Sequence, residues 1–337
     1  MTGPGASPYD RPALVAAARR SIRQGSKSFA TASRLFDGPT RERVWLLYAW
    51  CRACDDIADE QDHGHARDPA SLAEPMDAAA RLATIRTLTE LAMAGEVTGS
   101  PAFDALGQLV REVPLTQAMV DDVLAGFALD AADWRPVTEA DLLRYCYHVA
   151  GAVGVLMAAV MGVSADDDDP LAADTLDRAC DLGLAFQLAN IARDIADDHA
   201  VGRCYLPAQW LAESGISADA VLDPRHRPAL VALARRICTR AQEYEISART
   251  GARRLPWRQR WAVLSAAGIY GAIGREVSRR GDRAWDRRAH VPAPRKAMLM
   301  AGALRASLGA VAPGISGPPG PALSRRQLAR LARQPIA

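Results

Sequence analysis

Four aspartates, arranged as two pairs, give this sequence its clearest chemical signal: Asp55 with Asp59, and Asp194 with Asp198. Each pair has the spacing i, i+4, which places both carboxylates on one side of a helix. Two like charges at that spacing repel each other, and the cost rises when they are partly buried. A bound cation removes this cost, so each pair predicts a site for a positively charged ligand.

Each pair ends a longer polar stripe on its helix. At 3.6 residues per turn, Tyr48 and Arg52 fall within about 60° of the first pair, and we call these four residues the first stripe. Gln187 and Asn190 precede the second pair on one face and complete the second stripe. Both stripes are embedded in apolar sequence, which predicts that they line a cavity rather than a solvent-exposed surface.

The ligand types indicate which ion the stripes would bind. Carboxylate oxygens without histidine favour a hard ion, Mg²⁺ or Mn²⁺, over zinc. Magnesium held by one or two carboxylates completes its shell with water and phosphate oxygens, so a phosphorylated substrate is expected. The alternative is that the aspartates belong to ordinary solvated helix faces. The equal length of the two stripes argues against it, and Asp56 and Asp197, which lie off the stripes, are weaker candidates.

Basic and hydroxyl side chains near the stripes are candidates to bind the phosphate. Ser26 and Lys27 lie near a predicted helix end, where they would form a phosphate clamp. Arg203 follows the second stripe closely enough to reach the same site, and Tyr270 and Arg287 are candidates to close the cavity mouth. For these last three residues, plain solvation or packing stays an open alternative.

Bulk composition excludes several other classes of protein. Lys and Arg (41) nearly balance Asp and Glu (39), so no nucleic-acid partner is expected. The six cysteines are scattered through apolar helical patterns, as in a reduced cytosolic protein, and the single Cys51-x-x-Cys54 lacks the second pair of a zinc site. Residues 1–10 do not read as a signal peptide, and the most apolar run, residues 149–163, is too short to span a bilayer.

The elements that would position the stripes are helices, because apolar residues recur at helical spacing almost throughout. We therefore predict an all-α protein. No stretch resembles an interdomain linker, so residues 1–312 are predicted to form a single domain, followed by a Pro/Gly-rich and basic disordered tail over residues 313–337. The predicted helices span residues 10–25, 39–61, 74–94, 101–112, 116–131, 138–162, 170–199, 225–250, 256–280 and 293–311.

These segments resemble the squalene/phytoene synthase family of head-to-head prenyl transferases over roughly residues 18–288, with the closest match to its bacterial phytoene synthase members. Four blocks in the family's order make the resemblance much more specific than a single aspartate motif. They are Gly-Ser-Lys-Ser-Phe-Ala-Thr-Ala-Ser (25–33), Tyr-Ala-Trp-Cys-Arg-Ala-Cys-Asp-Asp-Ile-Ala-Asp (48–59), Arg-Tyr-Cys-Tyr-His-Val-Ala-Gly-Ala-Val-Gly (144–154) and Asp-Leu-Gly-Leu-Ala-Phe-Gln-Leu-Ala-Asn-Ile-Ala-Arg-Asp-Ile-Ala-Asp-Asp (181–198), the last continued by Gly-Arg-Cys-Tyr-Leu-Pro (202–207).

The resemblance implies an isoprenoid synthase fold, a helical bundle around a central cavity. It implies an enzyme that condenses two geranylgeranyl diphosphates through prephytoene diphosphate to phytoene, with release of diphosphate, in carotenoid biosynthesis. Both aspartate pairs would bind diphosphate through a magnesium cluster, with Gln187 and Asn190 as assisting positions and Asn190 as a fifth metal ligand. The positions that would contact diphosphate or intermediate are Ser26, Tyr48, Arg52, Arg193, Tyr270 and Arg287. The expected catalytic set is Asp55, Asp59, Asp194, Asp198, Tyr48 and Arg52.

The same resemblance implies Mg²⁺ or Mn²⁺ as the metal, ATP as a stimulator, and no use of NADPH. The protein is expected in the cytoplasm. Peripheral contact with the inner face of the membrane is left open, as a route for releasing an apolar product.

Three alternatives remain. A C30 synthase that condenses farnesyl diphosphate to dehydrosqualene or squalene would share the same motifs, because chain length depends on cavity depth. Head-to-tail elongation or terpene cyclisation would use Asp-Asp-x-x-Asp, which residues 55–59 also spell, but the second stripe does not repeat it. A non-enzymatic assembly factor on the same fold is expected to lose stripe aspartates, and all four are present.

Overall fold

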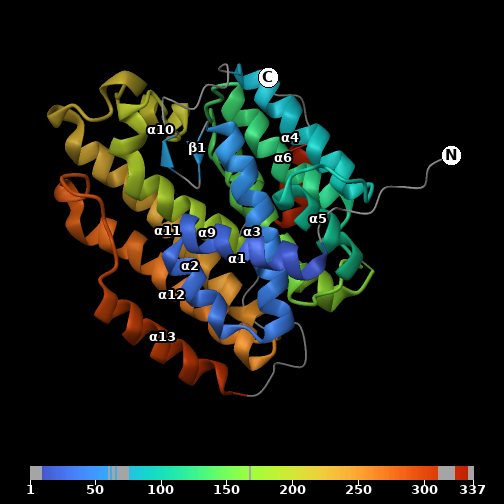
Figure 1. Cartoon of the computed structure of the whole chain (residues 1–337). Helices are drawn as coiled ribbons and strands as arrows, with labels where there is room; N and C mark the ends of the chain where they lie inside the picture. Colours follow the sequence, from blue (N-terminus) through green and yellow to red (C-terminus); the bar gives the residue numbers. More distant parts are fainter. Residues whose placement is uncertain are drawn as a thin grey trace. The chain divides into compact units, whose positions relative to one another are not determined.

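Helices make up nearly all the regular structure in the computed structural model, which describes residues 10–59, 61–62, 65–66, 76–166, 168–309 and 323–332. The prediction of an all-α protein is confirmed (Figure 1). Within the described ranges, the only strands are β1 (Gln61–Asp62) and β2 (His65–Ala66), a short antiparallel hairpin. The chain divides into two compact units: unit 1 comprises Met1–Ala132 with Ala159–Ala165, and unit 2 comprises Asp133–Ala158 with Asp166–Ala337. The single domain over residues 1–312 stays a prediction.

Unit 1 has its core where three helices, α1, α3 and α5, pack on one another. Leu14 of α1, Leu46 of α3 and Ala105 of α5 are almost completely buried at this contact. α4 packs on α5 and α6, and the indole of Trp50 on α3 donates a hydrogen bond to Thr89 on α4 at 3.3 Å. The helices of unit 1 are α1 (Arg11–Gly25), α2 (Lys27–Ala32), the 3₁₀-helix η1 (Ser33–Leu35), α3 (Gly38–Ala58), α4 (Ala78–Met93), α5 (Pro101–Glu112) and α6 (Gln117–Ala131).

The helix of the first stripe, α3, begins with a strong local signal. Asp37 accepts a hydrogen bond from the backbone N–H of Thr40 at 2.9 Å, and Pro39 occupies the first turn. The helix ends at Ala58 instead of continuing to residue 61 as predicted, so Asp59 is its C-cap. Its last turn is therefore acidic at the end where the helix dipole is negative, which is unfavourable unless a cation is near.

Unit 2 is organised around α9, the helix of the second stripe. α9 packs along α11 and α12, and α12 packs on α13 (Figure 1). Asp169 begins α9 by accepting hydrogen bonds from the backbone N–H groups of Leu171 and Ala172. The helices of unit 2 are α7 (Glu139–Cys146), the π-helix η2 (Tyr147–Gly151), α8 (Ala152–Val160, whose last two residues count with unit 1), α9 (Pro170–Ala200), α10 (Ala208–Glu213), η3 (Ala218–Ala220), η4 (Pro224–His226), α11 (Arg227–Ala252), α12 (Trp257–Arg280), η5 (Gly281–Arg283), α13 (Ala293–Ser307) and α14 (Arg325–Ala332).

Glycines let α9 cross the α7–α8 segment at backbone contact. A Cβ atom on Gly183 would lie 2.2 Å from the carbonyl oxygen of Ala150, and one on Gly154 would lie 2.4 Å from the carbonyl oxygen of Ala179. Only glycine fits at such distances. The sequence predicted one continuous helix over residues 138–162, whereas the structure interrupts it with the π-helical turn η2 at this crossing.

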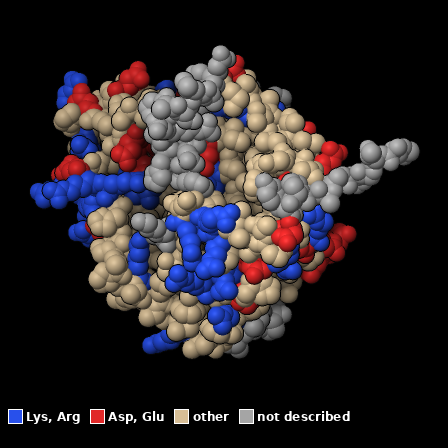
Figure 2. All heavy atoms as spheres, viewed as in Figure 1, with Lys and Arg blue, Asp and Glu red and all other residues tan. Residues whose placement is uncertain are grey.

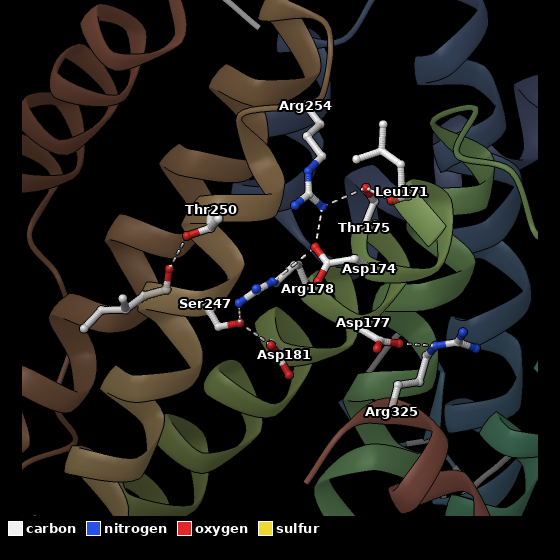
Figure 3. A network of polar contacts seen from close by, with 11 residues as sticks. Leu171, Asp174, Thr175, Asp177, Arg178, Asp181, Ser247, Thr250, Arg254 and Arg325 are labelled. Carbon is white, nitrogen blue, oxygen red and sulfur yellow. Dashed lines mark hydrogen bonds and ion pairs between the residues drawn. The ribbon is translucent and has the colours of Figure 1, made fainter. Parts of the chain in front are cut away.

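A buried polar network ties α9 to α11 (Figure 3). Arg178 on α9 donates to the hydroxyl of Ser247 on α11 at 2.7 Å, and that hydroxyl donates to the carboxylate of Asp181. One turn away, Asp174 forms an ion pair with Arg254, which lies just beyond the end of α11, at 2.6 Å. Burial raises the pKa of Asp181 to about 7, although the hydrogen bond from Ser247 opposes this effect.

The C-terminal segment departs from the prediction of a disordered tail. Residues 323–332 are described, and within them α14 packs on α7, η2 and α9. Leu328 is fully buried, and Arg325 forms an ion pair with Asp177 of α9 at 2.8 Å. An apolar side chain at one position and an ion pair at another are enough to dock this short helix, so the prediction is wrong for these residues. The Pro/Gly-rich residues 313–321 lie outside the described ranges.

One segment, Glu139–Val160, is long and apolar enough to cross a membrane by length and composition. The prediction considered only residues 149–163 and therefore found no run of sufficient length. Of its most apolar window, 72% is buried inside the protein, which is the environment of a core helix.

Candidate active site

The first stripe lies along one face of α3 and reaches its C-terminal end. Arg52 pairs with Asp56 at 3.0 Å and lies 3.7 Å from Asp55, so it neutralises part of the acidic turn. The side chain of Asp55 is 47% exposed, yet desolvation by the surrounding protein raises its pKa, to about 7. The carboxylates of Asp59 and Asp130 add to the rise. A carboxylate that is this hard to ionise by itself is a favourable position for a divalent cation.

Asp130 on α6 is an acidic neighbour that the sequence did not indicate. It belongs to unit 1 and contributes to the raised pKa of Asp55 through repulsion. Nothing in the local pattern of α6 distinguishes Asp130 from Asp121 or Asp122, because its nearness to the first stripe depends on how α6 packs.

The end of α1 places Ser26 beside the first stripe. A Cβ atom on Gly25 would lie 2.4 Å from the hydroxyl oxygen of Tyr48, so the backbone of α1 touches the stripe directly. The Ser26 hydroxyl begins α2 by accepting a hydrogen bond from the backbone N–H of Phe29 at 3.2 Å, and the ring of Phe29 lies 5.6 Å from that of Tyr48. The residues on either side of Ser26 therefore lie against Tyr48, and the shared role of Ser26 and Tyr48 in binding diphosphate stays a prediction. The side chain of Lys27 lies outside the described part of the structure.

The second stripe is held by arginines. Arg193 donates to Asp194 Oδ1 at 2.7 Å, and Arg288 donates to both carboxylate oxygens of Asp194 at 2.8 and 2.9 Å. Burial alone would raise the pKa of Asp194, but these hydrogen bonds and charges hold it below its ordinary value. One turn later the environment reverses: burial and repulsion from Asp194 raise the pKa of Asp198 to about 6, opposed by Arg203.

The arginine that reaches the stripe is Arg288 rather than the predicted Arg287. The indole of Trp285 donates a hydrogen bond to the carbonyl oxygen of Ala192 at 3.0 Å, which anchors this segment on α9. From that anchor the Arg288 side chain points to Asp194, whereas the described contact of Arg287 is its carbonyl oxygen, which accepts from Arg280. Arg287 and Arg288 are adjacent and lie in a segment without regular structure. The sequence alone therefore could not indicate which of them reaches the stripe.

Arg203 lies where the sequence placed it, near the end of the second stripe. Together with Asp198 it lines a hollow of about 250 Å³ whose floor includes Ile191, Ile195 and Leu206. A cation facing a carboxylate across a small hollow is an arrangement suited to a phosphate group with its metal ion. This part of the site lies entirely within unit 2, and the role of Arg203 in binding diphosphate stays a prediction.

Asn190 belongs to the second stripe, and Tyr270 contacts α9 about one helical turn before it. Asn190 Oδ1 is buried and accepts no hydrogen bond from any described residue, so it is available as an oxygen ligand. The Tyr270 ring on α12 stacks on Phe186 of α9, with centroids 4.0 Å apart and planes 19° from parallel. Gln187 follows Phe186 and is half-buried.

A second hollow does not coincide with the second stripe. It has about 610 Å³ of open space between α9, α11 and α12, with Ala185 and Ala189 on its floor and Glu245 in its wall. At 100° per residue these two alanines lie on the side of α9 opposite to Asp194. This groove therefore lies on the other side of α9 from Asp194, although Phe186, which stacks on Tyr270, also lines it.

The donor set fits a hard divalent metal ion that needs the substrate to complete its shell. Among the described residues, no three His, Cys, Asp or Glu side chains come together as a ready-made metal site. Magnesium usually takes only one or two protein carboxylates and fills its remaining positions with water and phosphate oxygens. The buried free oxygen of Asn190 and the raised pKa values of Asp55 and Asp198 are consistent with such partial sites.

Comparison with known proteins matches these features to a known family. The chain fits the family model described as squalene/phytoene synthase over residues 22–295. It is 48% identical over 292 residues to a phytoene synthase of Pseudescherichia vulneris, covering 86% of this chain and 91% of that protein. It is 47% identical over 279 residues to a 15-cis-phytoene synthase of Enterobacter agglomerans, covering 83% and 91%. A crystal structure of a dehydrosqualene synthase in complex with ligand superposes with a TM-score of 0.73 at 26% identity, covering 88% of this chain and 97% of that chain.

Proposed function

This chain belongs to the squalene/phytoene synthase family, and from that premise we propose that it condenses two geranylgeranyl diphosphates into phytoene. The predicted family and isoprenoid synthase fold are confirmed. Members of the family carry out divalent-metal-dependent chemistry on prenyl diphosphates. The relatives at 48 and 47% identity favour the C40 product over the C30 alternative, which the more distant dehydrosqualene synthase represents.

The observation that carries the proposal is the placement of both aspartate pairs at the C-terminal ends of long helices. Asp55 and Asp59 end α3, and Asp194 and Asp198 lie in the last two turns of α9. The negative end of each helix dipole makes these the least favourable positions for carboxylates in the absence of a cation. Both units thus present a carboxylate pair that is stabilised when a cation and a diphosphate bind.

The mechanism assigns the protein residues mainly to binding and charge stabilisation. Bound divalent ions would be held by the four stripe aspartates and Asn190, and would supply positive charge against the leaving diphosphate. Arg193, Arg203 and Arg288 donate hydrogen bonds to phosphate oxygens as negative charge builds on them. Burial raises the pKa of Tyr48, so its phenol stays protonated and is available to donate a hydrogen bond to a bound diphosphate.

The reaction proceeds in two halves. In the first, the allylic C–O bond of one geranylgeranyl diphosphate breaks, the resulting cation adds to a double bond of the second molecule, and loss of a proton closes the cyclopropane ring of prephytoene diphosphate. In the second, this intermediate loses its diphosphate, rearranges and loses another proton to give phytoene. The stacked rings of Phe186 and Tyr270 present π faces beside the second stripe, which favour a nearby carbocation.

The proposal includes cofactors and location. Mg²⁺ or Mn²⁺ is the metal, no NADPH is consumed because phytoene forms by proton loss, and ATP acts at most as a stimulator. The protein works in the cytoplasm with peripheral contact to the inner face of the membrane, because its product is a hydrocarbon.

The test is incubation of the purified full-length chain with geranylgeranyl diphosphate and Mg²⁺ or Mn²⁺, without nicotinamide, followed by extraction of hydrocarbons. We expect phytoene. A parallel reaction with farnesyl diphosphate, with and without NADPH, detects dehydrosqualene or squalene, and product from farnesyl diphosphate alone would establish the C30 alternative. A product that requires isopentenyl diphosphate would replace the proposal with chain elongation.

A further inference from the structure

Five arginines of unit 1 gather on one exposed surface away from the acidic turn. We call this set the arginine patch: Arg19, Arg20 and Arg23 on α1, Arg34 in η1 and Arg41 at the start of α3. Four of them are exposed and Arg41 is half-buried. In Figure 2, basic side chains gather over the region where Figure 1 labels α1 and α2.

The arginine patch has no acidic partner within the described ranges, in contrast to two other arginines of the same helices. Arg11 pairs with Glu42 and Glu112 at 2.6 and 2.7 Å, and Arg43 pairs with Glu112 at 3.1 Å. No comparable ion pair is formed by a member of the patch in the described part of unit 1. The same two helices thus carry both arginines that are neutralised by glutamates and arginines that are not.

Trp45 of α3 contacts arginines of the patch from both α1 and α3. The guanidinium of Arg19 lies 5.8 Å from the centre of the indole ring, and that of Arg41 lies 5.5 Å from it. The indole N–H donates to the hydroxyl of Ser33 at 2.9 Å, which fixes the ring beside Arg34. Guanidinium groups around a half-buried indole combine charge with an amphipathic ring, the composition favoured where proteins meet a membrane surface.

Like charges held together without counter-charges are unfavourable by themselves, so the patch is arranged for an anionic partner. We propose that the arginine patch is a docking surface for the anionic phospholipid headgroups of a membrane. The choice of a lipid surface over other polyanions rests on the proposed function, because a prenyl substrate and a hydrocarbon product both partition into lipid.

The position of Trp45 on α3 relates the docking surface to the first stripe. Trp45, Tyr48, Arg52 and Asp55 follow one another at intervals of three or four residues, so they share one helix face. At 1.5 Å per residue, Asp55 lies about 15 Å along the helix axis from Trp45. A membrane bound at the patch is therefore one short stretch of α3 away from the first carboxylate pair.

The test measures binding of the full-length chain to vesicles by flotation. We expect binding to vesicles of phosphatidylglycerol and phosphatidylcholine, weakening with added salt, and little binding to phosphatidylcholine alone. Replacing Arg19, Arg20 and Arg23 together by Gln should lower the affinity about 100-fold, since each basic residue at an anionic membrane surface contributes about fivefold. A matched control, Arg225→Gln with Arg279→Gln and Arg305→Gln, removes three charges from exposed positions of unit 2 and should bind as the unaltered chain does.

A second variant leaves Arg19 in place, so it tests the proposal even if the loss of Arg19 disturbs folding. Arg20→Gln with Arg34→Gln leaves the stacking on Trp45 intact and should weaken binding more than tenfold, while phytoene formation in detergent stays at its basal rate. Equal binding by patch and control variants, or equal binding to neutral vesicles, would overturn the proposal. The proposal would also be overturned if the protein bound RNA more tightly than anionic vesicles at the same phosphate concentration. Full displacement of the protein from vesicles by free diphosphate at that concentration would overturn it as well. Vesicle binding without any prenyl transfer would instead overturn the proposed function and leave the docking surface standing.

Discussion

Arg288 donates two parallel hydrogen bonds to Asp194, at 2.8 and 2.9 Å, and Arg193, which lies beside Asp194 on α9, donates to the same carboxylate. Asp194 is therefore ionised over the whole neutral range, whereas Asp198, four residues later, has a pKa of about 6. Two carboxylates in one stripe thus differ in how readily they carry charge, because Asp194 has two arginines in contact, whereas burial and the negative charge of Asp194 outweigh the effect of Arg203 on Asp198.

Replacing Arg288 by Gln should reduce kcat/KM for geranylgeranyl diphosphate by about 100-fold, the effect of losing a preorganised donor to a developing negative charge. Arg287→Gln is the matched control, since Arg287 is the adjacent residue and carries the same charge. It should change the rate by no more than a few-fold. Steady-state kinetics on both variants decide the matter, and the opposite ranking would return Arg287 to the site.

Replacing Asp55 or Asp194 by Ala should lower turnover by at least about 100-fold, because each would remove a metal-binding carboxylate. Far-UV circular dichroism should be unchanged, since neither side chain supports a helix contact in the core. Asp197→Ala is the control: Asp197 lies off the second stripe, with its side chain 65% exposed. A near-normal rate for Asp55→Ala or Asp194→Ala would remove that residue from the site.

The buried carboxyl of Asp181 should make stability depend on pH. Its folded-state pKa of about 7 lies above the value of 3.8 expected when unfolded, so the folded state binds the proton more tightly. Its contribution is fully present below pH 3.8 and is lost as the pH rises through about 7. Asp181→Asn cannot ionise, so its unfolding free energy relative to the unaltered chain should improve from pH 5 to pH 8. Urea denaturation at both pH values tests this, and a difference that does not change with pH would contradict it.

Gly183→Ala should prevent stable folding, because the new Cβ would lie 2.2 Å from the carbonyl oxygen of Ala150 and neither backbone can move easily. Gly302→Ala, inside α13 with no atom within 4 Å of the new Cβ, is the matched control. It should stabilise the protein by about 0.5–1 kcal/mol through helix propensity. Thermal unfolding of both variants distinguishes a packing effect from a general intolerance of alanine.

Periodicity was enough to predict the parts of the site that lie on helices. Tyr48, Arg52 and Asp55 share one face of α3, and Asn190 and Asp194 share one face of α9, as the i, i+3 and i, i+4 spacings require. The caps Asp37 and Asp169 also lie where local sequence favours a helix start. These features depend on residues close together in the chain.

Features that depend on contacts distant in sequence were not predictable. The choice of Arg288 over Arg287 depends on the hydrogen bond from Trp285 to Ala192, made across more than ninety residues. The helix α14 follows a Pro/Gly-rich stretch and is short, so its own sequence favours disorder. It is helical because Leu328 finds a buried position on unit 2 and Arg325 finds Asp177.

The π-helical turn between α7 and α8 amounts to a one-residue insertion absorbed without a loop. Deleting one residue of this turn would remove the surplus residue, so the segment could run as a regular α-helix with the later residues in almost the same rotational position. Gly154 would then still face the carbonyl oxygen of Ala179 on α9. A single-residue deletion in the middle of α7 or α8 would instead rotate the residues after it by about 100° and should be tolerated far less well.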